Sequence, residues 1–183
     1  MKKLIVLGLA IATTVMARAA AYDWRTSTTG KAYVAGTTTL LSGTAYLIDA
    51  AVLSQSAAFT SLSGGTAASA LTSLSSKSVS SGVIAADSTK VFNWGTDPSQ
   101  ALTAYVVIQD GDNFFISDTL SKTGDASSTT SMQFNLKSAS QKALDTTGSY
   151  SGAGWYGKAV PEPTSGLLML VGLGALALRR RRA

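Results

Sequence analysis

The sequence predicts a mainly β protein: a small sandwich-like or compact β-rich domain with one or two short helices, between an N-terminal signal helix and a C-terminal transmembrane helix. Three observations predict it. The interior of the chain holds about seven or eight short β-prone runs separated by turn signals. One interior segment, rich in Ser, Thr and Ala, has helical spacing of its apolar residues. Each end of the chain carries an apolar stretch, one over residues 4–15 and one over about 164–178, which predict the two flanking helices.

The N-terminal segment has the parts of a secretory signal peptide. A positive start precedes an apolar run over residues 4–15. Ala17 and Ala19 form a small-x-small cleavage site, and Ala19 with Ala21 offers a second one. An uncleaved signal anchor is the alternative, but the apolar run is short for a membrane span. We therefore expect the secretion machinery to export the chain and signal peptidase to remove residues 1–21.

The middle region, residues 22–159, is nearly neutral although the whole chain has a formal net charge of +5. It holds eight Lys and Arg against nine Asp and no Glu, a net charge of −1 (8 − 9). Without a basic patch to neutralise phosphates, nucleic acid is not expected as a partner. The chain also has no Cys and no His. Disulfides, the commonest general base and the commonest metal ligands are therefore absent, and no cofactor is expected.

The first half of the middle region begins with weak secondary-structure signals. Residues 22–39 are turn-rich with scattered aromatic side chains. The runs 38–41 and 44–48 are β-prone and are separated by Ser42-Gly43, which predicts a hairpin.

The segment 54–81 is dominated by Ser, Thr and Ala. Its apolar residues follow helical spacing after Thr66, a candidate N-cap. We expect one or two short helices interrupted at Gly64-Gly65, or else a mobile loop.

The second half gives stronger strand signals. The expected strands are 78–86, 90–94, 101–108, 113–117 and 132–136. The run 101–108 is the most apolar, which predicts a central strand. Asp110-Gly111-Asp112 has the composition of a hairpin turn, so 113–117 should pair with that run. Residues 154–160 close the domain.

The C-terminal segment, residues 160–183, has three parts in a fixed order. A glutamate between two prolines comes first, an uncharged run over about 164–178 follows, and four arginines come last: Pro161, Glu162, Pro163, Arg179, Arg180, Arg181 and Arg182. A helix of this length reaches about 22 Å, short of the roughly 30 Å hydrocarbon core. The arginines should stay on the cytoplasmic side, which places the middle region on the other side of the membrane.

This arrangement resembles the PEP-CTERM sorting signal of Gram-negative bacterial envelope proteins. The resemblance implies recognition by an exosortase, a membrane-embedded transpeptidase-like protease. It also implies transient anchoring in the inner membrane, removal of the tail, and delivery to the cell surface or extracellular matrix. Pro161, Glu162 and Pro163 would then be the recognition motif, and the four arginines the stop-transfer tail. An anchor that is never processed is the alternative.

The middle region also resembles small uncharacterised PEP-CTERM proteins, over residues 104–117 and at Trp155. These proteins have no known activity. The resemblance therefore adds no substrate, cofactor or catalytic residue to the interpretation.

Two patterns in the middle region are typical of binding sites. Residues 152–157 fit G-x-G-x-x-G, but no helix is expected after them, which favours a flexible loop that bears aromatic residues. Four oxygen-bearing side chains of the kind that bind calcium lie close together: Asp110, Asp112, Asn113 and Asp118. Their spacing is not that of an EF-hand, which favours a solvated hairpin tip.

Catalytic patterns are weak. Ser-Lys pairs occur at Ser76-Lys77, Ser121-Lys122 and Ser140/Lys142, but these lysines are expected to be protonated and solvated. Paired aspartates could cleave glycosides, yet the middle region has no Glu. We therefore expect a protein that is not an enzyme.

Aromatic side chains offer the last candidate chemistry, stacking on sugar rings. The candidates are Tyr22, Trp24, Trp94, Trp155 and Tyr156. In a domain of small residues such rings are mostly needed as core. The favoured hypothesis is a structural or adhesive protein of the cell surface or extracellular matrix, with extracellular polysaccharide as a candidate partner. A carbohydrate-binding module with exposed Trp and Tyr is the alternative, and a hydrolase comes third.

Overall fold

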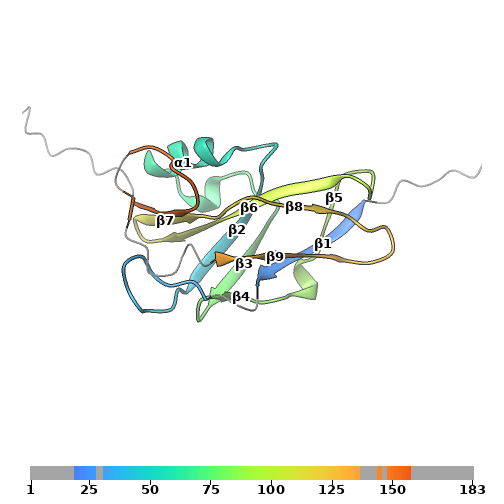
Figure 1. The fold of residues 1–183 in the computed structure, drawn as a ribbon, viewed down its shortest axis with the longest axis horizontal. Helices are drawn as coiled ribbons and strands as arrows, with labels where there is room; N and C mark the ends of the chain where they lie inside the picture. The colour runs from blue at the N-terminus through green and yellow to red at the C-terminus, as the bar shows by residue number, and fades with distance from the viewer. Residues whose placement is uncertain (1–18, 28–30, 137–143, 146–147, 158–183) are drawn as a thin grey trace, which may run out of the picture.

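The structure is a computed structural model that describes residues 19–27, 31–136, 144–145 and 148–157. Within these residues, one sheet has three strands and another has seven, and they are accompanied by a short α-helix and two 3-10 turns (Figure 1). The mainly β fold predicted from the sequence is confirmed. The expected signal helix and transmembrane helix lie outside the described residues.

The small sheet is built around β1 (Ala20–Thr26). On one side β5 (Phe92–Trp94) pairs antiparallel with residues 20–22 of β1, and on the other β9 (Thr130–Phe134) pairs parallel with residues 22–26. Alternate side chains of β1 are buried: Ala20, Tyr22, Trp24 and Thr26. This period of two places one face of β1 on the core.

The large sheet is antiparallel, in the order β10-β7-β6-β2-β3-β4, and β8 also pairs with β6. Its strands are β2 (Gly43–Asp49), β3 (Ser75–Ser80), β4 (Val83–Ile84), β6 (Ala101–Asp110), β7 (Asn113–Ile116), β8 (Leu120–Thr123) and β10 (Gly154–Gly157). The strand β6 lies between β2 and the pair β7 and β8. The central position predicted for residues 101–108 is confirmed.

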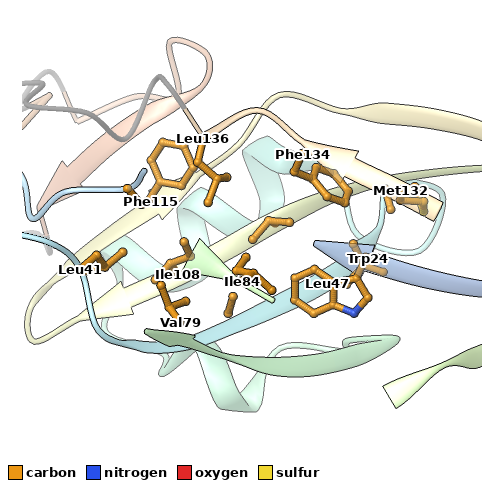
Figure 2. Close-up of a cluster of buried hydrophobic side chains, with 14 of the residues drawn as sticks. Trp24, Leu41, Leu47, Val79, Ile84, Ile108, Phe115, Met132, Phe134 and Leu136 are labelled. Carbon is orange, nitrogen blue, oxygen red and sulfur yellow. The ribbon is translucent and has the colours of Figure 1, made fainter. Parts of the chain in front are cut away.

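The core has two clusters on opposite faces of the large sheet. The inner cluster lies between the sheets and includes Leu102, Val106 and Ile108 of β6 with side chains of β1 and β9 (Figure 2). The outer cluster joins Tyr105 and Val107 of β6 to α1 (Gln55–Ser63) and the 3-10 turn η1 (Ala68–Ala70). Because both faces of β6 are covered, its sequence is a continuous apolar run.

The short helical elements predicted in the Ser/Thr/Ala-rich segment are confirmed. Helix α1 begins after Ser54, whose hydroxyl accepts a hydrogen bond from the Ala57 N–H, and it ends at Gly64. The 3-10 turn η1 follows. Thr66 is not its N-cap, since Ala67 holds that position without a side-chain hydrogen bond.

Three details of the predicted strands were wrong. The expected hairpin of 38–41 with 44–48 is absent: β2 pairs with β3 and β6, and Leu40 forms only an isolated bridge with Tyr33. With apolar side chains on both faces, β2 buries more surface between two strands than in a local hairpin. The second error is that residues 22–39 were interpreted as turn-rich, so β1 was not predicted.

The third error concerns residues 78–86, which were expected to form one strand. They are divided between β3 and β4 by a turn at Ser81 and Gly82, whose φ angles are 49° and 73°. A side chain at Gly82 would place its Cβ 2.4 Å from the Ala32 carbonyl oxygen. The turn therefore requires glycine at this position.

Candidate functional site

The predicted targeting residues lie almost entirely outside the described residues. This applies to Ala17, to the proline-glutamate-proline motif and to the arginine tail. Ala19 is described and directly precedes β1. Cleavage at Ala17 and Ala19, recognition of the motif and the role of the tail stay predictions.

The start of β1 bears on the two candidate cleavage positions. Ala20 is fully buried and pairs with Trp94 of β5, and Ala21 pairs with Asn93. A Cβ added at Gly124 would lie 2.2 Å from the Ala20 Cβ, so the chain packs tightly there. Cleavage after Ala19 keeps β1 whole, whereas cleavage after Ala21 removes two paired residues. We predict that Edman sequencing of the exported protein begins at Ala20 and not at Tyr22, the start that removal of residues 1–21 would give.

The aromatic side chains considered for sugar stacking are in the core. Tyr22, Trp24, Trp155 and Tyr156 are at most 1% exposed. Trp94 is partly buried, packs edge-on against Tyr22 with ring centroids 6.3 Å apart, and donates from Nε1 to the Asp49 carboxylate at 3.1 Å. These five rings therefore form no flat exposed row on which a sugar could stack.

Most of the glycine-rich segment 152–157 is an edge strand and not the expected flexible loop. Residues 154–157 form β10, paired with β7. Trp155 lies in the inner cluster against Phe115, with ring centroids 5.7 Å apart. Tyr156 lies in the outer cluster, 5.0 Å from the ring of Phe59. The alternation of the strand sends the two rings to opposite faces of the sheet.

The hairpin predicted at Asp110-Gly111-Asp112 is present. Asp110 pairs with Asn113, and Gly111 turns the chain with a φ of 59°. Among the residues that the structure describes, no group of three or more acidic side chains could hold a metal ion. The calcium candidates Asp110, Asp112, Asn113 and Asp118 thus do not converge as such a group.

Three other aspartates are used in local turns. Each carboxylate accepts hydrogen bonds from the backbone N–H and the hydroxyl of the residue two positions on: Asp87 from Thr89, Asp97 from Ser99 and Asp125 from Ser127. The Thr89 and Ser99 bonds lower the pKa of Asp87 and Asp97. The Ser127 backbone N–H and the hydroxyls of Ser127 and Ser128 lower the pKa of Asp125 to about 2. These carboxylates stabilise turns.

The Ser-Lys candidates have different surroundings. Ser121 and Lys122 are exposed on β8, and Ser140 with Lys142 lies outside the described residues. The expectation that Lys77 is solvated was wrong, because only 4% of this residue is exposed. Its neighbour Ser76 points to the opposite face of β3, so the two side chains do not form a nucleophile and base.

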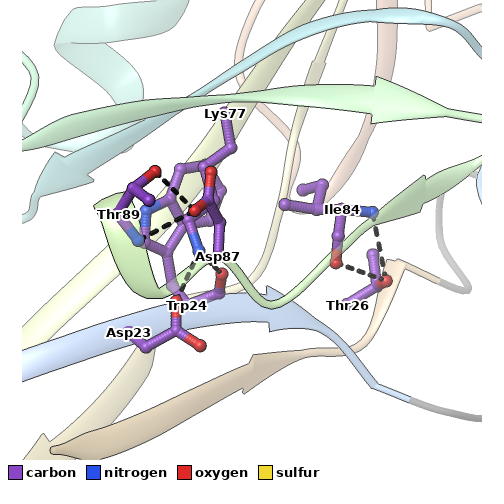
Figure 3. A network of polar contacts seen from close by, with 7 residues as sticks. All are labelled: Asp23, Trp24, Thr26, Lys77, Ile84, Asp87 and Thr89. Carbon is purple, nitrogen blue, oxygen red and sulfur yellow. Dashed lines mark hydrogen bonds and ion pairs between the residues drawn. The ribbon is translucent and has the colours of Figure 1, made fainter. Parts of the chain in front are cut away.

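Lys77 is the centre of a buried polar contact between the sheets (Figure 3). Its ammonium forms an ion pair with the Asp23 carboxylate and donates to the Trp24 carbonyl oxygen at 2.7 Å. The same Nζ lies 5.6 Å from the centroid of the Trp24 ring. Because Lys77 is on β3 and Asp23 is on β1, the ion pair joins the large sheet to the small one.

The position of this contact follows from the length of β5. The strand β5 pairs with β1 only as far as Tyr22. Beyond Tyr22, β5 no longer covers this edge of β1. Two side-chain contacts lie there: Lys77 donates to the Trp24 carbonyl oxygen of β1, and the Thr26 hydroxyl is hydrogen-bonded to both N and O of Ile84 on β4 at 3.2 Å. The Trp24 carbonyl of β1 and the Ile84 backbone groups of β4, the edge strand of the large sheet, thereby gain partners.

The sequence analysis missed this contact, although one signal was present. In β3, Lys77 occupies the same parity as Val79, which faces the inner cluster. A lysine at an inward position needs a buried partner. The predicted strand began at residue 78, so this parity was not apparent.

The comparison with protein families adds the decisive observation. Residues 159–182 match the family described as the PEP-CTERM protein-sorting motif. The chain carries a PEP-CTERM sorting signal. This confirms the resemblance seen at residues 160–183, and the signal implies export, processing by an exosortase and targeting to the cell surface. The comparisons with curated proteins and with solved structures gave no match.

In the part of the chain that the structure describes, no helix has the length and apolar character needed to cross a membrane. The predicted span at about 164–178 lies outside that part.

Proposed function

We propose that this protein is a non-catalytic structural or adhesive component of the cell surface or extracellular matrix. The PEP-CTERM sorting signal, which implies export to the surface, is the observation that carries the proposal. The use of the large aromatic rings as core supports it, because these rings hold the sandwich together. We propose extracellular polysaccharide as the partner of the solvent-exposed surface, where the hydroxyl side chains of Ser and Thr are frequent.

A paired set of strains tests this function. One strain lacks the gene, and the others restore the native chain or a chain with Pro161→Ala and Pro163→Ala. We expect the native chain in the surface or matrix fraction and the double variant in the membrane fraction. Cell adhesion or matrix cohesion should fall in the deletion strain and recover only with the native chain. Normal adhesion and cohesion without the gene would overturn the proposal.

The carbohydrate-binding alternative predicts a different result. Purified protein would then bind isolated matrix polysaccharide through Trp94, the least buried of the five candidate rings. Binding that is lost in Trp94→Ala but kept in Tyr33→Ala would favour that alternative.

A further inference from the structure

Lys77 and Asp23 bring an amine and a carboxyl group together at the contact between the two sheets. Their side chains are 2% and 15% exposed and in direct contact. An amine and a carboxyl group are the two groups from which an amide forms, and the fold holds them in contact at a high effective concentration.

We propose that Lys77 and Asp23 form an isopeptide bond, an amide between the Lys77 Nζ and the Asp23 Cγ. A proton first passes from the ammonium to the carboxylate, and the Nζ lone pair then attacks Cγ. The C–N bond forms, the C–O bond to the hydroxyl breaks, and a proton from nitrogen leaves with that hydroxyl as water. One water is lost, and no oxidant, reductant or further reactant is required.

The surroundings fit the product of this reaction. The new amide nitrogen keeps one proton, and the Trp24 carbonyl oxygen, 2.7 Å from Nζ, already accepts a hydrogen bond from that atom. The ring of Trp24 covers the same nitrogen at 5.6 Å from its centroid. The product therefore keeps its hydrogen bond while two buried charges disappear, and with them the cost of keeping charge away from water.

The bond would join the two sheets where β5 leaves the edge of β1 open. The linked residues are 54 positions apart in the chain, so the crosslink would close a long loop and restrict the unfolded state as a disulfide does. The sequence contains no Cys. An isopeptide bond gives a covalent link of this kind without thiol chemistry, and reducing agents do not break it.

Mass spectrometry of the full chain, purified from the cells that produce it, tests the proposal. We expect an intact mass lower than the sequence mass, for the termini observed, by one water. Trypsin should fail to cleave after Lys77, and tandem spectra should identify a branched peptide that joins the segments around Asp23 and Lys77. An unmodified mass with normal cleavage after Lys77 would overturn the bond. A loss of water without the branched peptide would overturn it equally.

Variants identify the reacting groups. Lys77→Met should restore the full mass, whereas Lys122→Met, at an exposed lysine of β8, should still lose one water. Asp23→Asn should lose one ammonia in place of one water, because the amide nitrogen becomes the leaving group. A water loss that persists in Lys77→Met would place the modification elsewhere. The branched peptide is sought in the native chain, so a variant that fails to fold does not affect the test.

Discussion

The two faces of the large sheet are covered by different means. On the inner face a second sheet packs against it, and polar side chains join the two at the open edge of β1. On the outer face, α1 and η1 cover an apolar and aromatic cluster in which Phe59 contacts Phe114 and Tyr156 at ring distances of 5.9 and 5.0 Å. Both faces bury large side chains, but the buried lysine that the structure describes, Lys77, lies on the inner face.

Backbone hydrogen bonding explains this difference. A helix satisfies its interior N–H and C=O groups within itself, so α1 needs only an apolar face toward the sheet. A sheet satisfies them through neighbouring strands, and a strand without a neighbour presents free groups. In the inner layer, Lys77 therefore supplies a donor to the open edge of β1, and Thr26 supplies a partner to the Ile84 backbone at the edge strand β4.

The largest effect is expected in the outer layer. Phe59→Ala removes the ring that packs against Phe114, Tyr150 and Tyr156. A buried Phe→Ala change costs about 3–5 kcal/mol in free energy of unfolding. Urea unfolding of this variant measures the cost, with Val52→Ala as the control because Val52 is 63% exposed. Equal midpoints for the two variants would mean that α1 contributes little to the core.

The next effect is expected at the polar contact of the inner layer. Measured against the unlinked ion pair, Asp23→Ala leaves Lys77 buried without its carboxylate, and breaking a buried pair in this way costs about 3 kcal/mol. The exposed Asp118→Ala is the matched control in the same urea titration. Among the residues that the structure describes, no side chain belongs to both clusters, so Phe59→Ala and Asp23→Ala should add in the double variant. Strong non-additivity would contradict the separation of the layers.

Much of this architecture could be predicted from the sequence where a strand or helix is specified by its own residues. The apolar run of β6, the Asp-Gly-Asp hairpin and the helix that ends at Gly64 all depend on local patterns. In contrast, β8 has no apolar pattern, since only Leu120 is even partly buried, and it forms because β6 offers an edge. Local sequence carries no signal for such a strand.

The polar contact could not be predicted because it depends on pairing between distant segments. Alternation in β1 is visible over residues 20–26, but it was obscured because the signal peptide was expected to end at residue 21. That Lys77 lies beside Asp23 follows only once β1 and β3 are placed in different sheets and the β5 pairing is known to end at Tyr22. The sorting signal, in contrast, is a contiguous pattern and was recognised from the sequence.

A smaller effect is expected at the second polar side-chain contact between the sheets. Thr26→Val keeps the shape of the residue and removes the hydroxyl that is hydrogen-bonded to Ile84 N and O. An unpaired buried N–H costs about 1–3 kcal/mol, so we expect the free energy of unfolding to fall by about 2 kcal/mol. Thr39→Val, at an exposed position, is the control. Wild-type stability in Thr26→Val would show that the Ile84 backbone on β4 needs no side-chain partner.

The smallest effect concerns a polar group in the outer layer. The Tyr105 hydroxyl donates to the Leu53 carbonyl oxygen at 2.9 Å, so Tyr105→Phe should cost about 1 kcal/mol at neutral pH. Burial raises the pKa of Tyr105. Above about pH 10 an unfolded tyrosine loses its proton while the buried hydroxyl keeps it.

Tyr105 therefore favours the folded state fully below pH 10, and this contribution declines as the pH rises further. Between about pH 10 and 12 the native protein should lose about 1.4 kcal/mol per pH unit more than Tyr105→Phe, so the stability gap closes and then reverses. Urea titrations of both proteins at pH 8 and pH 11 measure this difference. Because the lysines and the other tyrosines are common to both proteins, parallel losses of stability would contradict a buried, neutral Tyr105 beneath α1.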